Sequence, residues 1–596
     1  MSKVVLCGLV LCAVSCSSSE SDSAGSAGNP STAGSNGSLQ AGAGPSNAGA
    51  TATGGGSTAG SAGAPSGGSG GTNAGSSGAG AGGAAGGAGG AGGAGGVVAG
   101  AGGAPAASES VTQRGADSAR TSHFLAPTLT RANVMSKMAL DANFKANFDG
   151  EFTGSPLFLA GASAGSGRFF AATTENDVYA LDEISGAQVW KHNIGGYLVT
   201  APVCGNDPKN HGIVSTPIID AATHRLFVAA AMTDGHHEIH ALSTDTGMEV
   251  TGWPVDVSKI KAGNLAFPSG VQNQRSALSL VNGILYVAFG GYCGDGGNYH
   301  GWVIGVNSTD PTKIGAWATK DNRQAGIWAA GGLASDGNGV FAVTGNAPEQ
   351  GNHDNTDSEE ILRITDLGVA HRDSQNLFYP TEWANPMNSS DKDFGSASPS
   401  VVSVPGAKPA TIIVAPAKPG RVYFLDASNL GGSLGQYADM VVADTNEQSI
   451  YTTPSAYQAA SGVHVAISAG SGAQCPKGNT NNVVMSILLK PSAANQAPMP
   501  AKAWCAAIGG GDVPKRSPIS TNSAGAVDPI VWYLNGSSLN AFDGEDGTVL
   551  YDSSKGNAPS ACAGVHKFTT LIEVNGRIVV GGDSGGKAHL CSWSVH

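Results

Sequence analysis

A recurring pattern of apolar and polar positions runs along most of the chain. In residues 176–190 (NDVYALDEISGAQVW), an apolar strand is followed by Asp182, a short turn with Gly186 and a returning strand. The first strand is apolar on both side-chain parities, so we expect both of its faces to be covered. In the turn, Asp182 is expected to accept backbone N–H groups, and Gly186 is expected to supply the positive φ.

The same outline returns towards the C-terminus. The further copies are residues 238–250 (EIHALSTDTGMEV), 302–310 (WVIGVNSTD), 361–368 (ILRITDLG), 421–432 (RVYFLDASNLGG) and 538–551 (SLNAFDGEDGTVLY). A sheet that is buried on both faces and is repeated in series is typical of a propeller blade between two neighbours.

The first strands of these units predict an all-β fold over residues 116–596, an eight-bladed β-propeller of four-stranded antiparallel blades. The blades are expected to begin near Gly154, Val214, Arg275, Ile327, Phe394, Tyr451, Arg516 and Lys567. The last blade ends at His596, soon after its third strand. We therefore expect residues within 121–152 to complete that blade and close the ring, so that no edge is left exposed.

The N-terminal region has a different character. Residues 1–15 combine a lysine with the apolar run VVLCGLVLCAV, which predicts a signal peptide of the lipoprotein type, with Cys16 as the lipidated residue. An ordinary cleaved signal peptide is the alternative. Residues 16–115 are almost wholly small and polar, so we expect a disordered tether. These features predict export to the bacterial cell envelope, at the outer membrane or the cell surface.

Charge narrows the choice of partners. The chain carries 44 acidic and 31 basic residues, a formal net charge of -13, and no cluster of Lys or Arg. This composition argues against nucleic acid and against anionic membrane surfaces as partners. The expected contact with a membrane is through the lipid anchor only.

Six cysteines follow the signal peptide and the lipidation site. An even number in an exported chain favours disulfides. Closeness within the inferred blades favours Cys475 with Cys505 and Cys562 with Cys591, which leaves Cys204 for Cys293. Several free, buried thiols are the alternative.

Three motifs resemble the repeats of the quinoprotein alcohol dehydrogenase-like (PQQ-like repeat) β-propeller family. They are residues 179–190 (YALDEISGAQVW), 272–291 (QNQRSALSLVNGILYVAFGG) and 415–429 (APAKPGRVYFLDASN). The resemblance spans about residues 116–596. It implies an eight-bladed propeller which, in many members of that family, holds pyrroloquinoline quinone (PQQ) and calcium.

The resemblance also implies roles for four residues. Asn346, in AVTGN, resembles a calcium ligand, and Asp393 falls near the family's catalytic base. Lys418 matches the basic residue that contacts the quinone, and Trp328 matches a stacking floor for a flat ring. Each has a structural alternative. Trp328 could be an interblade wedge, Asn346 a turn cap, Asp393 a turn former and Lys418 a solvated loop charge.

The chain also departs from the family pattern. The family's calcium-binding Glu should precede residues 300–307 (HGWVIGVN), but Gly and Asn stand there and Asp295 is the nearest acid. Neither an adjacent Cys pair nor a CxxCH haem motif occurs in the sequence. These departures favour a lipid-anchored envelope propeller with a degenerate quinone site, which binds or scaffolds an envelope protein, a small molecule or a polysaccharide. A PQQ- and Ca²⁺-dependent alcohol or sugar dehydrogenase is the alternative.

Two further groups contain residue types that can bind a metal ion. His236, His237 and His240, with Asp234 and Glu238, contain ligands for a transition metal, but adjacent residues of a strand point to opposite faces. A hydrated hairpin tip is therefore favoured there. Residues 352–360 (NHDNTDSEE) are acidic enough for a surface calcium site, but they lack the DxDxDG spacing.

Overall fold

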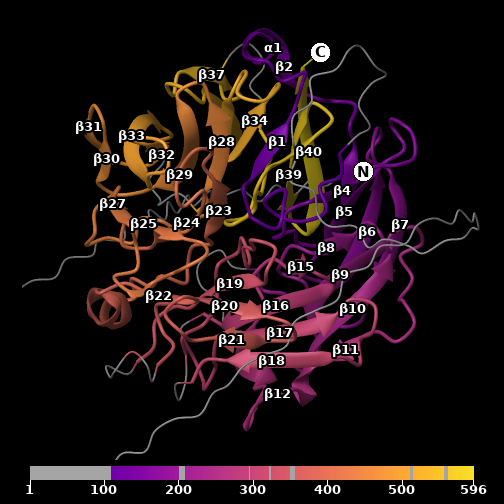
Figure 1. Ribbon diagram of the computed structural model, residues 1–596. Coiled ribbons are helices and arrows are strands. Elements are labelled where there is room, and N and C mark those ends of the chain that lie inside the picture. The colour runs from indigo at the N-terminus through magenta and orange to yellow at the C-terminus, as the bar shows by residue number, and fades with distance from the viewer. Residues whose placement is uncertain are drawn as a thin grey trace, which may run out of the picture. The chain divides into compact units, whose positions relative to one another are not determined.

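The structure is a computed structural model (Figure 1). It describes residues 109–199, 208–293, 295–320, 324–348, 353, 356–509, 515–555 and 561–595. The expected signal peptide, Cys16 and most of the expected tether lie outside the described residues. No helix in the described part of the chain is long and apolar enough to cross a membrane.

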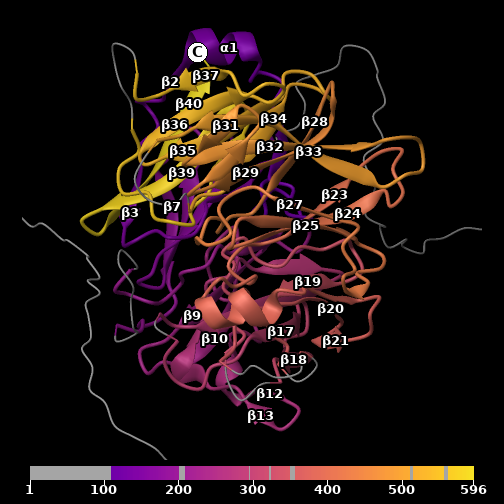
Figure 2. The same cartoon turned by 90° about the vertical axis from the view of Figure 1, so that its left-hand side faces the viewer.

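The described chain folds as the predicted eight-bladed propeller, with four or five strands in each blade (Figures 1 and 2). Blade 1 contains β4 (Leu157–Leu159), β5 (Arg168–Ala172), β6 (Asp177–Asp182) and β7 (Gln188–Asn193), and blade 2 contains β8 (Ile218–Asp220), β9 (Arg225–Ala231), β10 (His237–Ser243) and β11 (Val255–Asp256). Blade 3 contains β14 (Gln272–Asn273), β15 (Ser279–Val281), β16 (Ile284–Gly291), β17 (Trp302–Asn307) and β18 (Ile314–Ala318). Blade 4 contains β19 (Val340–Val343), β20 (Ile361–Thr365), β21 (Val369–His371) and β22 (Leu377–Tyr379), joined by β26 (Gly432–Ser433).

The other four blades complete the ring. Blade 5 contains β23 (Ser400–Ser403), β24 (Thr411–Ala417), β25 (Arg421–Asp426) and β27 (Ala438–Val441), and blade 6 contains β28 (Ser455–Ala459), β29 (Gly462–Ala469), β32 (Val483–Pro491) and β33 (Pro498–Ala507). Blade 7 contains β34 (Ile519–Asn522), β35 (Ile530–Asn535), β36 (Ser538–Asp543) and β37 (Val549–Asp552), with β1 (His123–Leu125). Blade 8 contains β38 (Ile572–Val574), β39 (Arg577–Ser584) and β40 (Lys587–Val595), with β2 (Met138–Leu140) and β3 (Ala146–Asp149). Two small ribbons, β12 (Lys261–Ala262) with β13 (Leu265–Ala266) and β30 (Ala473–Cys475) with β31 (Gly478–Thr480), lie outside the blades.

The repeated unit has the predicted form. In β6, the first five residues are buried, so both faces of the strand are covered by neighbouring blades. Asp182 Oδ1 accepts the N–H groups of Ile184 at 3.2 Å and Ser185 at 2.8 Å, and Gly186 has a φ of +73°. Blade 4 differs from the prediction, because its first strand is reduced to a single bridge between Ala334 and Phe341.

The ring closes through the N-terminal residues, as predicted. The last strand, β40, pairs antiparallel with β2 through Met138–Leu140 and with β3 through Ala146–Asp149. Figures 1 and 2 both show β2 beside β40. Between β1 and β2 lies the helix α1 (Arg131–Lys137), whose N-cap Thr130 accepts the N–H of Asn133. The outer edge of the last blade is thereby covered.

Two of the predicted disulfides are confirmed. Cys475 is bonded to Cys505, and Cys562 to Cys591. Cys293 is also disulfide-bonded, and its predicted partner Cys204 lies outside the described residues. Each of the two confirmed bonds ties a blade strand to a nearby connecting segment, β33 to the ribbon at β30 and β40 to the loop before β38, as closeness in sequence indicated.

Residues 109–126, which we call the axial segment, follow the inner ends of the blades in turn. Their carbonyl groups accept backbone N–H groups from Phe158 (blade 1), Ile219 (blade 2), Ser335 (blade 4), Val401 (blade 5), Ala456 (blade 6) and Ser520 (blade 7). The guanidinium of Arg120 donates to Leu278 O and Ser279 Oγ of blade 3, and that of Arg114 donates to Phe568 O before β38. The segment therefore contacts all eight blades.

Candidate functional site

A cavity of about 330 Å³ lies where the inner ends of the blades meet, and we call it the axial cavity. The four residues that the sequence predicted for a site, Trp328, Asn346, Asp393 and Lys418, all line it. They come from blade 4 and from the loops of blade 5. The axial segment also contributes, because Arg114 is part of the lining.

Lys418 holds two carboxylates on one side of the cavity. Its Nζ lies 2.5 Å from Asp393 Oδ2 and 2.8 Å from Asp391 Oδ1. Burial is the largest single influence and lowers the pKa of Lys418, but the two aspartates outweigh it and raise the pKa overall. Lys418 and Asp393 are only 6% and 1% exposed. Lys418 is therefore a buried cation and not a solvated loop charge.

Trp328 occupies a slot made by glycines. A Cβ atom would approach the indole to 2.5 Å at Gly290, 2.7 Å at Gly326 and 2.3 Å at Gly345. These distances are too short for any side chain, so the three glycines are needed for the ring to lie there. The indole Nε1 donates to Gly291 O at 3.3 Å, and Tyr299 meets the ring at its edge. Trp328 is therefore held in one orientation on the cavity wall.

Asn346 follows β19 and lies beside an acid that the sequence analysis missed. Glu359 donates its N–H to Gly345 O at 3.2 Å, and its Oε2 accepts the N–H of Phe394 at 2.5 Å. Glu359 is fully buried, and burial, followed by the charge of Asp393, raises its pKa well above the usual range. A hydrogen-bond partner is lacking, within the described chain, for both Glu359 Oε1 and Asp393 Oδ1.

The loop of residues 352–360, which its spacing disfavoured as a surface calcium site, turns inward where the structure describes it. Asp357, Glu359 and Glu360 are buried, because the loop returns towards β19 and Arg372 pairs with Asp357. The sequence signal for Glu359 was the run of acids itself, but only the fold shows that the run turns inward.

Among the described residues of the cavity lining, basic side chains outnumber acidic ones. Arg114, Arg275, Lys418, Lys515 and Lys567 line it, together with Asp295, Asp391 and Asp393. This balance is opposite to the net charge of -13 for the whole chain. Asp295 accepts the hydroxyl of Tyr299 at 2.7 Å, while the other two acids contact Lys418. The axial cavity therefore favours anionic ligands.

Comparison with known proteins identifies the fold of the chain but not its activity. Neither a family model nor a curated protein sequence matches the chain. A quinohemoprotein alcohol dehydrogenase from Comamonas testosteroni has a TM-score of 0.53 at 14% identity, over 81% of this chain and 80% of that chain. The fold is that of the quinoprotein alcohol dehydrogenase propellers.

Two more solved structures support this fold. The alcohol dehydrogenase ADHIIG of Pseudomonas putida HK5 has a TM-score of 0.52 at 12% identity, over 82% of this chain and 80% of that chain. A europium-containing methanol dehydrogenase has a TM-score of 0.52 at 14% identity, over 80% of this chain and 90% of that chain. At these identities, the likeness shows the eight-bladed propeller fold and leaves activity open.

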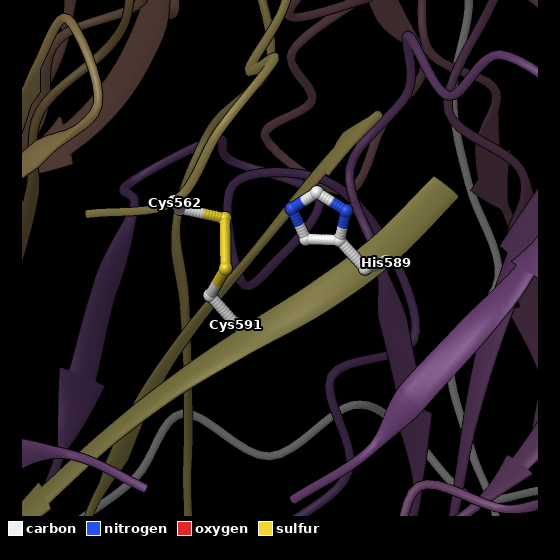
Figure 3. Close-up of side chains that lie close together, drawn as sticks. All are labelled: Cys562, His589 and Cys591. Carbon is white, nitrogen blue, oxygen red and sulfur yellow. A yellow bond between two sulfur atoms is a disulfide. The ribbon is translucent and has the colours of Figure 1, made fainter. Parts of the chain in front are cut away.

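The histidine group of this propeller differs from the expected hydrated tip. His237 and His240 are buried, at 2% and 3% exposure, because β10 is covered on both faces. As predicted, neighbours point apart: His237 faces Phe289, whereas His236 and His240 flank Glu238 on the other face. In the described chain, ligand atoms converge within 4.8 Å in only one such group, Cys562, His589 and Cys591 (Figure 3). The two sulfurs of that group are joined as a disulfide, so they are not available to a metal.

Proposed function

We propose that this chain is an exported propeller, anchored by a lipid at Cys16, which binds a planar, polyanionic small molecule in its axial cavity. The observation that carries the proposal is the cavity itself, where a fixed indole lines the same space as the basic side chains that are in excess among the described lining residues. A flat ring stacks on an indole, and carboxylates are attracted to Lys and Arg. In the scaffolding form of this proposal, the ring binds an envelope protein instead of a small molecule.

PQQ fits this description, because it is a flat, fused ring system that carries carboxylates. Trp328 would face the ring, and Lys418 would contact its polar edge. Asp393 Oδ1, which has no hydrogen-bond partner among the described residues, is an oxygen donor for calcium, and Asn346 lines the same cavity. Calcium fits less well, since it takes 6–8 oxygen ligands and Lys418 already holds the other oxygen of Asp393.

The test of binding is a titration of the purified protein with PQQ, with and without Ca²⁺, followed by the absorbance of the quinone and by tryptophan fluorescence. We expect saturable binding, weakened about tenfold or more in Lys418→Met, because a charge-assisted contact contributes about 1.5–3 kcal/mol. The matched control is Lys313→Met, an exposed lysine on an outer turn. Absence of binding at micromolar quinone would remove PQQ as the ligand.

Alcohol or sugar oxidation is the second candidate, favoured by the free oxygen of Asp393 beside the cavity. When bound, the quinone would supply a two-electron acceptor. Asp393 Oδ1 would orient the substrate hydroxyl and accept its proton, and Lys418 would hold Asp393 in position through its other oxygen. We expect alcohol-dependent dye reduction to be lost in Asp393→Asn and kept in Asp391→Asn, whose side chain is 62% exposed. Equal activity in both variants would exclude this role for Asp393.

The lipid anchor has its own test. Metabolic labelling with a radioactive fatty acid should label the chain, and Cys16→Ala should lose the label. Label that persists in this variant would place the modification elsewhere.

A further inference from the structure

We propose that Cys562, His589 and Cys591 form a zinc site when the disulfide between the two cysteines is reduced. None of these residues lines the axial cavity, so the proposal does not depend on the proposed function. In the oxidised chain the two sulfurs are bonded to each other. In the reduced chain they bind Zn²⁺ together with the imidazole, and the metal ion replaces the covalent link.

The three side chains converge at one point on blade 8 (Figure 3). One ligand atom from each residue, the two sulfurs and a ring nitrogen of His589, lies within 4.8 Å of the others. The ligand atoms of a tetrahedral zinc ion are about 3.5–3.8 Å apart, because Zn–S and Zn–N bonds are about 2.3 Å and 2.0–2.1 Å long. The two sulfurs therefore need to separate by only about 2 Å after reduction.

His589 and Cys591 lie on the same face of β40, because they are alternate residues of the strand. Figure 3 shows the imidazole beside the two sulfurs. Within the described chain, the imidazole makes neither a hydrogen bond nor an ion pair with another residue. A ring nitrogen of His589 can therefore bind a metal without the loss of such a contact.

Cys562 is held against this face by contacts other than the disulfide. Its N–H donates to Ser537 O of blade 7 at 2.8 Å, and the carbonyl of Gly564 accepts a backbone N–H from β39 at 3.1 Å. The segment lies directly on β39, because a Cβ atom at Gly582 would approach Ala563 O to 2.2 Å. We therefore expect the thiol of Cys562 to stay beside β40 after reduction.

The exposure of the two cysteines determines where reduction begins. Cys591 is partly exposed, whereas Cys562 is fully buried. A dithiol reductant attacks Cys591 Sγ and expels Cys562 as a thiolate, and its second thiol then expels Cys591. The chain gains two electrons and two protons as two thiols, and the reductant becomes a disulfide.

Two thiolates and one neutral imidazole suit zinc. Both thiols release a proton to solvent when the ion binds, so their two negative charges match the charge of Zn²⁺. Thiolates select soft cations, and sulfur and nitrogen ligands together are typical of Zn²⁺. Hard cations such as Ca²⁺ and Mg²⁺ prefer oxygen ligands. Three protein ligands leave the fourth position of the ion to water.

The disulfide at blade 6 provides the matched comparison. Cys475 and Cys505 are separated by 30 residues, and Cys562 and Cys591 by 29. Among the described residues, a third ligand converges only on the pair at blade 8. The proposal therefore predicts that, after reduction, tight zinc binding depends on the blade 8 cysteines and not on those at blade 6.

The experiment is a titration of the full mature chain with Co²⁺ and then Zn²⁺, before and after reduction with a phosphine. We expect the reduced chain, and not the oxidised chain, to show the absorbance bands of tetrahedral Co²⁺ bound to thiolates, and Zn²⁺ to remove them. His589→Gln should weaken binding about tenfold or more, because one of three ligands is lost. Cys562→Ser with Cys591→Ser should abolish the bands, and Cys475→Ser with Cys505→Ser should keep them.

The proposal is overturned if the reduced parent chain shows no such bands, or if His589→Gln binds Co²⁺ as tightly as the parent chain. Bands that depend on Cys475 and Cys505 instead would also overturn it. His589→Gln decides the matter if the variant without Cys562 and Cys591 fails to fold, because it keeps both cysteines.

Thermal unfolding gives a second measurement. Zn²⁺ should raise the melting temperature of the reduced parent chain, because it binds the folded state. The rise should be smaller in reduced His589→Gln. An equal rise in both chains would place the zinc elsewhere and reject this site.

Discussion

At the scale of single residues, burial decides what each titratable group can do. His237 lies on the covered face of β10, with its ring edge-on to Phe289 at 5.4 Å and to Phe267 at 6.1 Å. Its Nδ1 is buried without a hydrogen-bond partner among the described residues. Burial therefore lowers the pKa of His237 to about 3, and the charge of His236 adds to this.

His237 should make the protein sensitive to acid. The unfolded chain takes up this proton near pH 6.5, whereas the folded chain resists it until about pH 3. The stabilising contribution is therefore complete above the unfolded pKa and falls as the pH drops, by roughly 1.4 kcal/mol per pH unit. Urea unfolding at pH 7 and pH 5 should show a loss that is about 2 kcal/mol smaller in His237→Leu. The control is His224→Gln, an exposed histidine. An unchanged loss in His237→Leu would contradict this assignment.

The buried pair of Lys418 and Asp393 leads to a second prediction about stability. Lys418→Met would leave Asp393 buried without its cation, so we expect a loss of about 3–5 kcal/mol in the free energy of unfolding. Lys418→Met combined with Asp393→Leu should recover most of that loss, because the uncompensated charge is removed. Urea unfolding of the two single variants and the double variant measures the coupling. Additive losses would show that the two side chains do not stabilise each other.

At the scale of elements, the last blade relies on covalent and non-covalent closure together. The bond between Cys562 and Cys591 ties β40 to the loop that precedes β38 across 29 residues (Figure 3). Removing it by Cys562→Ser with Cys591→Ser should cost roughly 3–4 kcal/mol, because the unfolded chain regains freedom.

The matched comparison is Cys475→Ser with Cys505→Ser in blade 6, where the separation is 30 residues. Because the two loops are nearly equal in length, thermal unfolding should show similar losses. If stability is lost only when the blade 8 disulfide is removed, then ring closure, and not loop length, determines how much that disulfide stabilises the protein.

At the scale of the whole molecule, two N-terminal features close the ring, and truncation separates them. A chain that begins at Glu109 keeps the axial segment and should melt like the full chain. A chain that begins at Pro127 loses the axial segment but keeps β2 and β3, and it should melt at a lower temperature. A chain that begins at Gly154 loses both and should be the least stable, because β40 becomes an open edge.

Differential scanning calorimetry of the three chains checks this order. Equal melting temperatures for the chains from Glu109 and Pro127 would show that the axial segment adds no stability. A chain from Gly154 that melts like the full chain would contradict the closure by β2 and β3.

Much of the fold could be predicted, and less of the site. The repeated strand and turn around Asp182, two disulfides and the closure by residues before Gly154 are confirmed. Trp328, Asn346, Asp393 and Lys418 do meet in one cavity, and their roles stay predictions. The hydrated hairpin tip predicted for the histidines of β10 was wrong, because polar residue types alone do not show whether a neighbouring blade covers a strand.

The sequence by itself determined the local and periodic features of this protein. A strand that is apolar on both faces must be covered on both sides, and the repetition of such strands with an Asp and Gly turn favours a ring of blades. Only the tertiary structure decided the course of the axial segment, the inward acid Glu359 and the burial of Lys418 against Asp391 and Asp393. These contacts join residues far apart in sequence through loops without periodicity, so no pattern along the chain records them.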